Sequence, residues 1–427
     1  MKPVAAGLVC ITLVACRRDS DLVTPPTDGG VDVPPEAMTP EAMADSVPEA
    51  SDARSWTGIP GWADCEIFAL SKGLETIPAR TWSSCGAGCL ASPAATVGWS
   101  KGWAPIATAT FRDGDVLLKT GSIEPTFATQ LSRLSDGRTL GFIEQRRPMT
   151  ECGALAAHNL DSADLVTFFS GKSATIGAVR LVGGTFVSSA LRDATGKIAG
   201  SQVAVGVDGW GIGTRNGLYL APEASTTSWT RLDTAEPVGV SGRGGAIVWS
   251  SFAGADATLF ASFDATTPTA LLKTSPEGAP IFPVLATERL AWVSVMGPER
   301  AGGIYTGARL SWSDGPLKKG VPVNALSAPP IPFGFVGDPQ LGPDHIALVA
   351  CAKGSDLCPI VVTQISSKKQ WLVPARASMR WRRVLTVTSK EIVAVDASED
   401  APSYRADAIV RLDLGAIDAL SAADGGT

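Results

Sequence analysis

A basic segment near the C-terminus contains the residue types best suited to binding an anion. Between Asp356 and Glu391 the chain has no acidic residue but seven basic ones, and two tryptophans lie among them. Guanidinium groups bind carboxylates and phosphates well. The segment predicts a surface for lipopolysaccharide, an anionic glycan, an acidic protein or the chain's own acidic N-terminal part, with candidate binding residues Trp371, Arg376, Arg380, Trp381, Arg382 and Arg383. The simpler interpretation is a solvated sheet edge whose charges oppose aggregation.

Motifs for catalysis are scarce. The only histidines, His158 and His345, begin or interrupt strand-like runs, so we expect structural roles for both and no catalytic residue. Three glycine-rich stretches lack the spacing of a phosphate-binding loop, a dinucleotide site or a nucleophile elbow. We interpret all three as turns: 171–173, 209–213 and 239–242.

Carboxylates leave one enzymatic possibility open. Glycoside cleavage needs only two acids that flank the substrate, and these need not be neighbours in the sequence. The acidic pairs in 113–115 and 161–164 lack the ligand number of a calcium loop. We expect neither a metal nor a cofactor.

The twelve tryptophans suggest packing more strongly than carbohydrate binding. Trp249 and Trp292 occupy matching places in similar segments, which predicts packing between repeated units. Trp99, Trp103 and Trp210 lie in glycine-rich stretches that we expect to be loops, and these three remain possible ligand contacts.

The N-terminus has the form of a lipoprotein leader. Lys2 precedes a short apolar run, Val4 to Ala15, which is too short to span a bilayer but suits a signal peptide. The run ends in Leu13-Val14-Ala15-Cys16, which resembles the bacterial lipobox. The resemblance implies removal of 1–15, lipidation of Cys16 and attachment to a membrane. Because Arg17 rather than aspartate follows Cys16, it further implies the outer membrane.

Residues 17–54 predict a disordered tether. They contain nine acidic and three basic side chains, repeated Pro-Glu-Ala stretches and no aromatic residue. Such a composition cannot bury enough apolar surface to fold by itself. The tether carries the whole formal charge of −6, so the remainder is neutral, which argues against a nucleic-acid-binding protein.

Six cysteines remain for an exported chain once Cys10 leaves with the leader and Cys16 is lipidated. An even number predicts three disulfides, drawn from Cys65, Cys85, Cys89, Cys152, Cys351 and Cys358. Cys351 and Cys358 flank a short polar loop between strand-like runs, so we expect them to pair. The other four allow three pairings, among which we prefer Cys65–Cys85 with Cys89–Cys152.

Residues 55–427 show a repeated pattern of turn, apolar strand, loop and apolar strand. Its anchors follow at intervals of 43 to 61 residues, at Val97, Leu140, Phe186, Ile247, Leu290, Ile346 and Ile392. Short strands recurring near every 45 residues are typical of propeller blades. The pattern resembles the WD-repeat and TolB-like propellers, although the Gly-His and Trp-Asp dipeptides are missing. We predict an all-β fold: a β-propeller of about seven four-stranded blades.

These features together predict a membrane-tethered, non-catalytic propeller lipoprotein of the bacterial cell envelope that binds a protein or a glycan. The alternative is an envelope enzyme that acts on glycans through carboxylates at the propeller channel. The expected partners are the membrane, reached through the lipid on Cys16, and an unidentified envelope protein or glycan, but not nucleic acid.

Overall fold

The computed structural model describes the chain from Ser55 to Ala423. The leader, Cys16 and the acidic tether therefore lie outside the described residues. Within the described span the excluded segments are 60–65, 95–104, 113–114, 123–126, 146–151, 160–163, 171–174, 183–184, 193–201, 207–208, 215–216, 223–229, 233–236, 244–245, 265–266, 287–288, 298–304, 332–333, 352–357 and 402–405.

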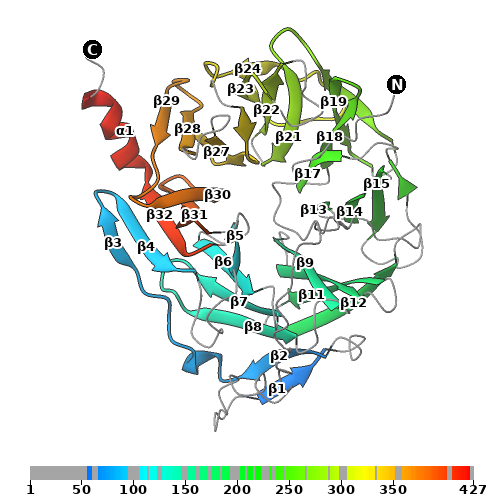
Figure 1. Ribbon diagram of the computed structural model, residues 1–427. Helices are drawn as coiled ribbons and strands as arrows, with labels where there is room; N and C mark the ends of the chain where they lie inside the picture. The colour runs from blue at the N-terminus through cyan, green and yellow to red at the C-terminus, as the bar shows by residue number, and fades with distance from the viewer. Residues whose placement is uncertain are drawn as a thin grey trace, which may run out of the picture.

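The described residues form seven antiparallel sheets, which are the blades of a β-propeller (Figure 1). Blades 1 to 3 contain, in chain order, β5 (Pro105–Arg112), β6 (Asp115–Ser122), β7 (Phe127–Arg133), β8 (Thr139–Gln145); β9 (Cys152–Asn159), β10 (Asp164–Ser170), β11 (Thr175–Val182), β12 (Thr185–Arg192); and β13 (Gln202–Gly206), β14 (Gly209–Thr214), β15 (Gly217–Pro222), β16 (Thr230–Arg231). Blades 4 and 5 contain β17 (Pro237–Arg243), β18 (Ala246–Ala253), β19 (Asp256–Ser262), β20 (Thr269–Lys273); and β21 (Ala279–Leu285), β22 (Leu290–Met296), β23 (Gly307–Ser313), β24 (Ala325–Ser327).

The last two blades depart from this simple order. Blade 6 contains β25 (Phe335–Val336), β26 (Gln340–Leu341), β27 (His345–Cys351), β28 (Ile360–Gln364) and β29 (Gln370–Val373). Both β25 and β26 pair with β27, so they form one innermost strand with a break between them. Blade 7 takes β30 (Met379–Val387), β31 (Glu391–Ser398) and β32 (Ala408–Asp413) from the C-terminal part, and β3 (Ser83–Gly86) and β4 (Cys89–Pro93) from the N-terminal part.

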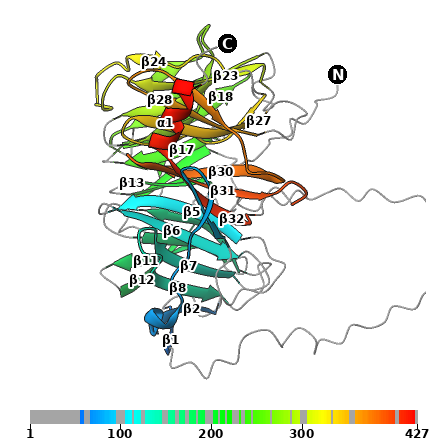
Figure 2. The same cartoon turned by 90° about the vertical axis from the view of Figure 1, so that its left-hand side faces the viewer.

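The first strand of each blade lies nearest the propeller axis. Contacts join β9 to β13, β13 to β17, β17 to β21, β21 to β26, β26 to β30, and β30 to β5. The remaining strands of each sheet extend outward from this ring, and Figure 2 shows the blades from the side. Residues on β26 and β30 therefore lie near the channel, whereas those on β29 lie at the periphery.

The two ends of the chain close the ring together. β4 pairs with β32 along Cys89–Pro93, so an N-terminal strand completes the C-terminal blade. The segment before β3 is fixed by Arg80, which is only 9% exposed. Its guanidinium donates to Ser92 and Pro93 on blade 7 and, at 3.5 Å, to Thr120 on blade 1. Burial lowers the pKa of Arg80 to about 10.

Further elements decorate the outer edges. β1 (Ser55–Gly58) and β2 (Ile67–Lys72) extend blade 1 beyond β8, and the short 3-10 helix η3 (Leu74–Thr76) follows them. The α-helix α1 (Leu414–Ala423) follows β32 and packs against β29 at the periphery (Figure 1). No helix among the described residues is both long and apolar enough to cross a membrane.

The apolar cores lie at the junctions between blades rather than within single blades. Trp249 of blade 4 packs with Leu218 and Leu232 of blade 3. Trp292 of blade 5 packs with Val248 and other residues of blade 4. Both indoles are at most 2% exposed, so the packing role predicted for these two tryptophans is confirmed.

The predicted fold class is confirmed, but the assignment of repeat anchors is wrong in the first blades. Ile247, Leu290, Ile346 and Ile392 all begin or lie near the start of the second strand of blades 4 to 7. In contrast, Leu140 and Phe186 lie on β8 and β12, the fourth strands of their blades, and Val97 lies outside the described residues.

Candidate functional site

The predicted basic segment runs from the outer edge of blade 6 to the inner edge of blade 7. Its two tryptophans are buried, Trp371 at 9% and Trp381 at 3% exposure, in the apolar core between these blades. The Trp381 indole N–H donates to the carbonyl of Val373 at 3.1 Å. The expectation that these indoles present an aromatic surface to a ligand is therefore wrong.

Arg376 has a structural partner that the sequence pattern conceals. Its Nε and Nη2 donate to the two carboxylate oxygens of Asp396 at 2.6 and 2.8 Å. The Asp396 side chain is completely buried, and this burial raises its pKa despite the opposing effect of Arg376. The pair holds the β29–β30 connection against β31, so this arginine is committed to the fold.

Arg382 is also used by the protein itself. Its Nη2 donates to the carbonyls of Ser398 and Ala401 at 3.2 and 2.7 Å. Burial lowers the pKa of Arg382, the nearby positive charge of Arg380 lowers it further, and Asp407 opposes both effects. Arg382 therefore stabilises the β31–β32 connection.

Arg383 differs from both, because the opposite charge that acts on it, Asp338, belongs to another blade. It sits on β30, the innermost strand of blade 7, and Asp338 lies in the break between β25 and β26 of blade 6. Burial raises the pKa of Asp338, and the Arg383 charge opposes that rise. Burial likewise lowers the pKa of Arg383, and Asp338 opposes that.

Both side chains nevertheless keep some accessible surface. Asp338 and Arg383 therefore form the best candidate site, at the inner edges of blades 6 and 7. Sequence reasoning included Arg383 but missed Asp338, because a lone aspartate before proline carries no recognisable motif.

The two histidines are far apart in the fold. His158 lies on β9 of blade 2, opposite Leu165 of β10. His345 starts β27, is 7% exposed, and its Nε2 lies 3.5 Å from Asp418 of α1. Its ring centroid is 6.4 Å from that of Trp371. His345 thus packs between blade 6 and α1.

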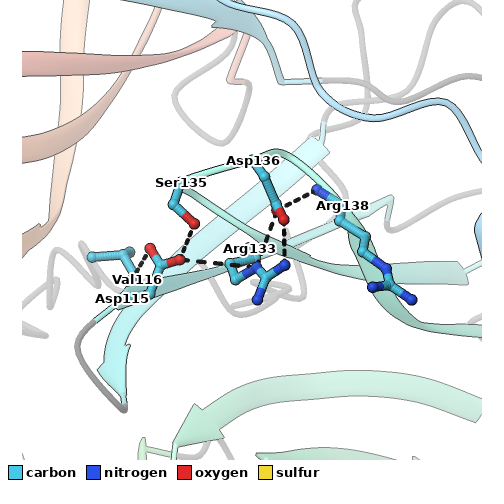
Figure 3. A network of polar contacts seen from close by, with 6 residues as sticks. All are labelled: Asp115, Val116, Arg133, Ser135, Asp136 and Arg138. Carbon is cyan, nitrogen blue, oxygen red and sulfur yellow. Dashed lines mark hydrogen bonds and ion pairs between the residues drawn. The ribbon is translucent and has the colours of Figure 1, made fainter.

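Asp115, from one of the acidic pairs considered for calcium, belongs to a turn network in blade 1 (Figure 3). Asp115 accepts hydrogen bonds from the backbone N–H of Val116 at 2.7 Å and from the hydroxyl of Ser135. Asp136 accepts from the Arg133 side chain and, at 3.0 Å, from the backbone N–H of Arg138. These carboxylates are occupied by protein donors, and the described residues contain no group of three or more potential metal ligands. Asp113 and 161–163 lie outside the described residues.

Two glycine-rich stretches expected to be turns are strands instead. Residues 209–213 belong to β14, and 239–242 belong to β17. Trp210 is consequently on a strand rather than in a loop. Segment 171–173, Trp99 and Trp103 lie outside the described residues.

The structure contains the predicted disulfide between Cys351 and Cys358, whose Cα atoms are 4.1 Å apart. It also pairs Cys85 with Cys89 across the β3–β4 turn, with Cα atoms 5.1 Å apart. The preference for Cys65–Cys85 and Cys89–Cys152 is therefore wrong. The close spacing of Cys85 and Cys89 in a tight hairpin favours the local pair. Cys65 lies outside the described residues.

Comparison with known proteins shows similarity of fold alone. No family model matches the sequence, and no curated protein matches it. The structure is similar to an oligogalacturonate lyase in complex with manganese, at 9% identity and a TM-score of 0.50, over 79% of this chain and 96% of that one. It is also similar to the β-propeller domain of the trilobed protease from Pyrococcus furiosus, at 11% identity and a TM-score of 0.42, over 78% of this chain and 96% of that one. A third similar structure is TolB from Acinetobacter baumannii, at 11% identity and a TM-score of 0.35, over 69% of this chain and 78% of that one.

Proposed function

We propose that this chain is a lipid-anchored, non-catalytic β-propeller of the bacterial cell envelope that binds a protein or a glycan. The lipobox-like sequence ending at Cys16 supports the anchor and an outer-membrane location, and the acidic segment 17–54 supplies a tether. The propeller begins directly after that tether, at β1. In this arrangement the blades stand away from the membrane and present their inner edges to a partner.

The observation that carries the binding proposal is the charged inner edge of blades 6 and 7. Burial shifts the pKa values of Asp338 and Arg383, the charge of each opposes the shift of the other, and both side chains are partly exposed. Ionisable groups whose pKa values are shifted by burial and by a charged neighbour occur often at functional sites. Trp249 and Trp292, by contrast, are buried in the apolar cores between blades.

The alternative, an envelope enzyme acting on glycans, rests on the raised pKa of Asp338, which suits a general acid. Glycoside cleavage requires a second carboxyl group across the substrate. Among the described residues, Arg383 is the charged group that acts on Asp338, and no second carboxyl does so.

Crosslinking capture from intact envelopes tests the proposal. The lipidated protein would carry a tag after Thr427, and a Cys16→Ser variant would serve as the unanchored control. Reproducible capture of one protein or glycan by the lipidated form supports an anchored binding protein. Capture no greater than in the control would overturn it, and turnover of envelope glycans by the purified protein would establish the enzyme instead.

A further inference from the structure

The junction between blades 7 and 1 contains a set of buried polar side chains. Val116 and Leu118 on β6 pack against blade 7, so Thr120, two residues further along that strand, faces blade 7 as well. On β7, Gln130 is the partner of Thr120, and Ser132 is the partner of Leu118. Paired residues of an antiparallel sheet point to the same face. Thr120, Gln130 and Ser132 therefore all lie in this junction, and each is at most 1% exposed.

Arg80 extends its guanidinium into the same junction. Its Nη1 donates to the Ser92 hydroxyl of blade 7 at 3.3 Å. Its Nη2 reaches the Thr120 hydroxyl of blade 1 at 3.5 Å, which is long for a hydrogen bond. Among the described residues, Nε of Arg80, Oγ of Ser132 and Oε1 of Gln130 have no hydrogen-bond partner. Three buried polar atoms in one junction thus retain unused bonding capacity.

The open part of Arg80 is the edge that arginine uses to bind anions. Nε and Nη2 lie on one side of the planar guanidinium, and their N–H groups match the two oxygens of a carboxylate. Arg376 and Arg411 each bind a carboxylate of this chain through these two nitrogens. On Arg80 the same edge has an unpaired Nε and meets the hydroxyl of Thr120.

The charge of Arg80 is buried without a counter-charge among the described residues. The side chain is 9% exposed, and desolvation is the cause that lowers its pKa to about 10. The guanidinium therefore remains protonated at neutral pH. Buried charges in proteins are normally paired, because an unpaired one destabilises the folded state.

We propose that the Nε–Nη2 edge of Arg80 binds a small monovalent anion, such as chloride, between blades 7 and 1. The hydroxyls of Thr120 and Ser132 would donate to the same ion. Gln130 would add its amide NH2, because the Thr139 hydroxyl, which accepts from this amide at 2.6 Å, can equally donate to its oxygen.

Burial and charge together determine the class of anion. The side chains around the site are at most 9% exposed, so the ion must be small and must shed its water. Arg80 supplies one positive charge, and a divalent anion such as sulfate would leave one negative charge buried and unbalanced. Because Arg80 is also bonded to Ser92 of blade 7, an ion held by Thr120 and Ser132 of blade 1 would stabilise the closed ring.

Urea unfolding of the full-length purified protein tests for this ion. Sodium chloride would replace sodium gluconate at pH 7 and constant ionic strength, since gluconate is too large for a buried site. An ion that binds only the folded protein lowers the unfolding equilibrium constant by mass action. We expect that constant to fall at least about tenfold between gluconate and about 0.2 M chloride. Equal stability in the two salts would overturn the proposal.

Gln130→Glu replaces the ion with a carboxylate of the chain itself. We expect this variant to lose the chloride dependence and to be at least as stable in gluconate as the unmodified protein. The matched control is Gln370→Glu in blade 6, because the Gln370 amide also donates to a threonine hydroxyl across the sheet. This control should keep the full chloride dependence. A Gln130→Glu protein that still responds to chloride as the control does would refute the site.

Ser132→Ala provides a milder variant, since it removes one hydroxyl and changes no charge. It should raise the chloride concentration needed for half of the stabilisation about tenfold, and an unchanged value would remove Ser132 from the site.

Bromide would locate the ion directly. Crystals of the full-length protein grown in sodium bromide should show an anomalous difference peak beside Nε of Arg80. A water molecule at that position, without anomalous signal, would show that the junction is hydrated and would overturn the anion site.

Discussion

The ion pair between Arg376 and Asp396 offers the sharpest test of how this propeller is held together. Asp396 is fully buried, and Arg376 supplies both of its side-chain hydrogen-bond donors. Replacement of Arg376 by methionine keeps the apolar stem but leaves the carboxylate without its counter-charge. Removing one member of a buried pair typically costs about 3–5 kcal/mol. Because the Arg376 side chain is 29% exposed, we expect the lower end, about 3 kcal/mol.

The loss should depend on pH in a defined direction. The pKa of Asp396 already exceeds its ordinary value of 3.8, and Arg376 is what restrains it. Arg376→Met removes that restraint, so the pKa rises further. A carboxyl whose pKa is higher in the folded state contributes stability that is fully present below the unfolded pKa and is lost as pH rises through the folded pKa. The variant should therefore be weakest near pH 7 and recover part of its deficit near pH 4.

Urea denaturation at both pH values would measure these effects, with Lys319→Met as the matched control. Lys319 pairs with Asp264 on the surface, where the side chains are 69% and 38% exposed, so its loss should cost less than about 1 kcal/mol. Arg376→Met combined with Asp396→Asn should be more stable than Arg376→Met alone, because no buried charge is left unpaired. A deficit as small as that of Lys319→Met, or one independent of pH, would refute the reasoning.

Three further predictions concern packing and closure. Trp249→Ala should lower the unfolding free energy by about 3–5 kcal/mol in the same denaturation assay, since the indole is fully buried between blades; a loss below about 1 kcal/mol would contradict this. Gly342→Ala should lower the calorimetric melting temperature, because its new Cβ would lie 2.7 Å from Cγ1 of Val387 on the next blade, and an unchanged value would show that these blades can move apart. Replacing Cys85 and Cys89 by serine should lower the unfolding free energy by about 2 kcal/mol. Non-reducing peptide mapping of the unmodified protein should recover the Cys85–Cys89 disulfide, and its absence from the map would contradict this prediction.

The general architecture was predictable because a blade repeats the same physical requirement. Each small sheet needs apolar residues on both faces to pack against its neighbours, and this repetition produced the spacing seen in the sequence. The phase of the repeat was harder to predict, since the first and last strands of a blade have similar composition. A better signal is Ser-Asp-Gly at 135–137 and 313–315, which lies at the end of the third strand in blades 1 and 5.

Ring closure could not be predicted from the period. The pairing of β4 with β32 joins segments that are more than 300 residues apart, and neither strand carries a pattern that specifies the other. The contacts that hold the ring closed join residues that are distant in the sequence. Arg80 connects blade 7 to blade 1, and Gly137 is so close to its backbone that a Cβ there would lie 2.4 Å from the Arg80 carbonyl oxygen.

The basic segment shows why a charge run read along the sequence can mislead. The absence of acidic residues between Asp356 and Glu391 suggested an uncompensated positive surface. In the fold, Asp396 on β31, the strand next to β30, neutralises Arg376. The negative charge of Asp407, just before β32, acts on Arg382. Compensation therefore comes from residues just beyond the run. Arg383 is the exception, since the opposite charge that acts on it, Asp338, comes from another blade.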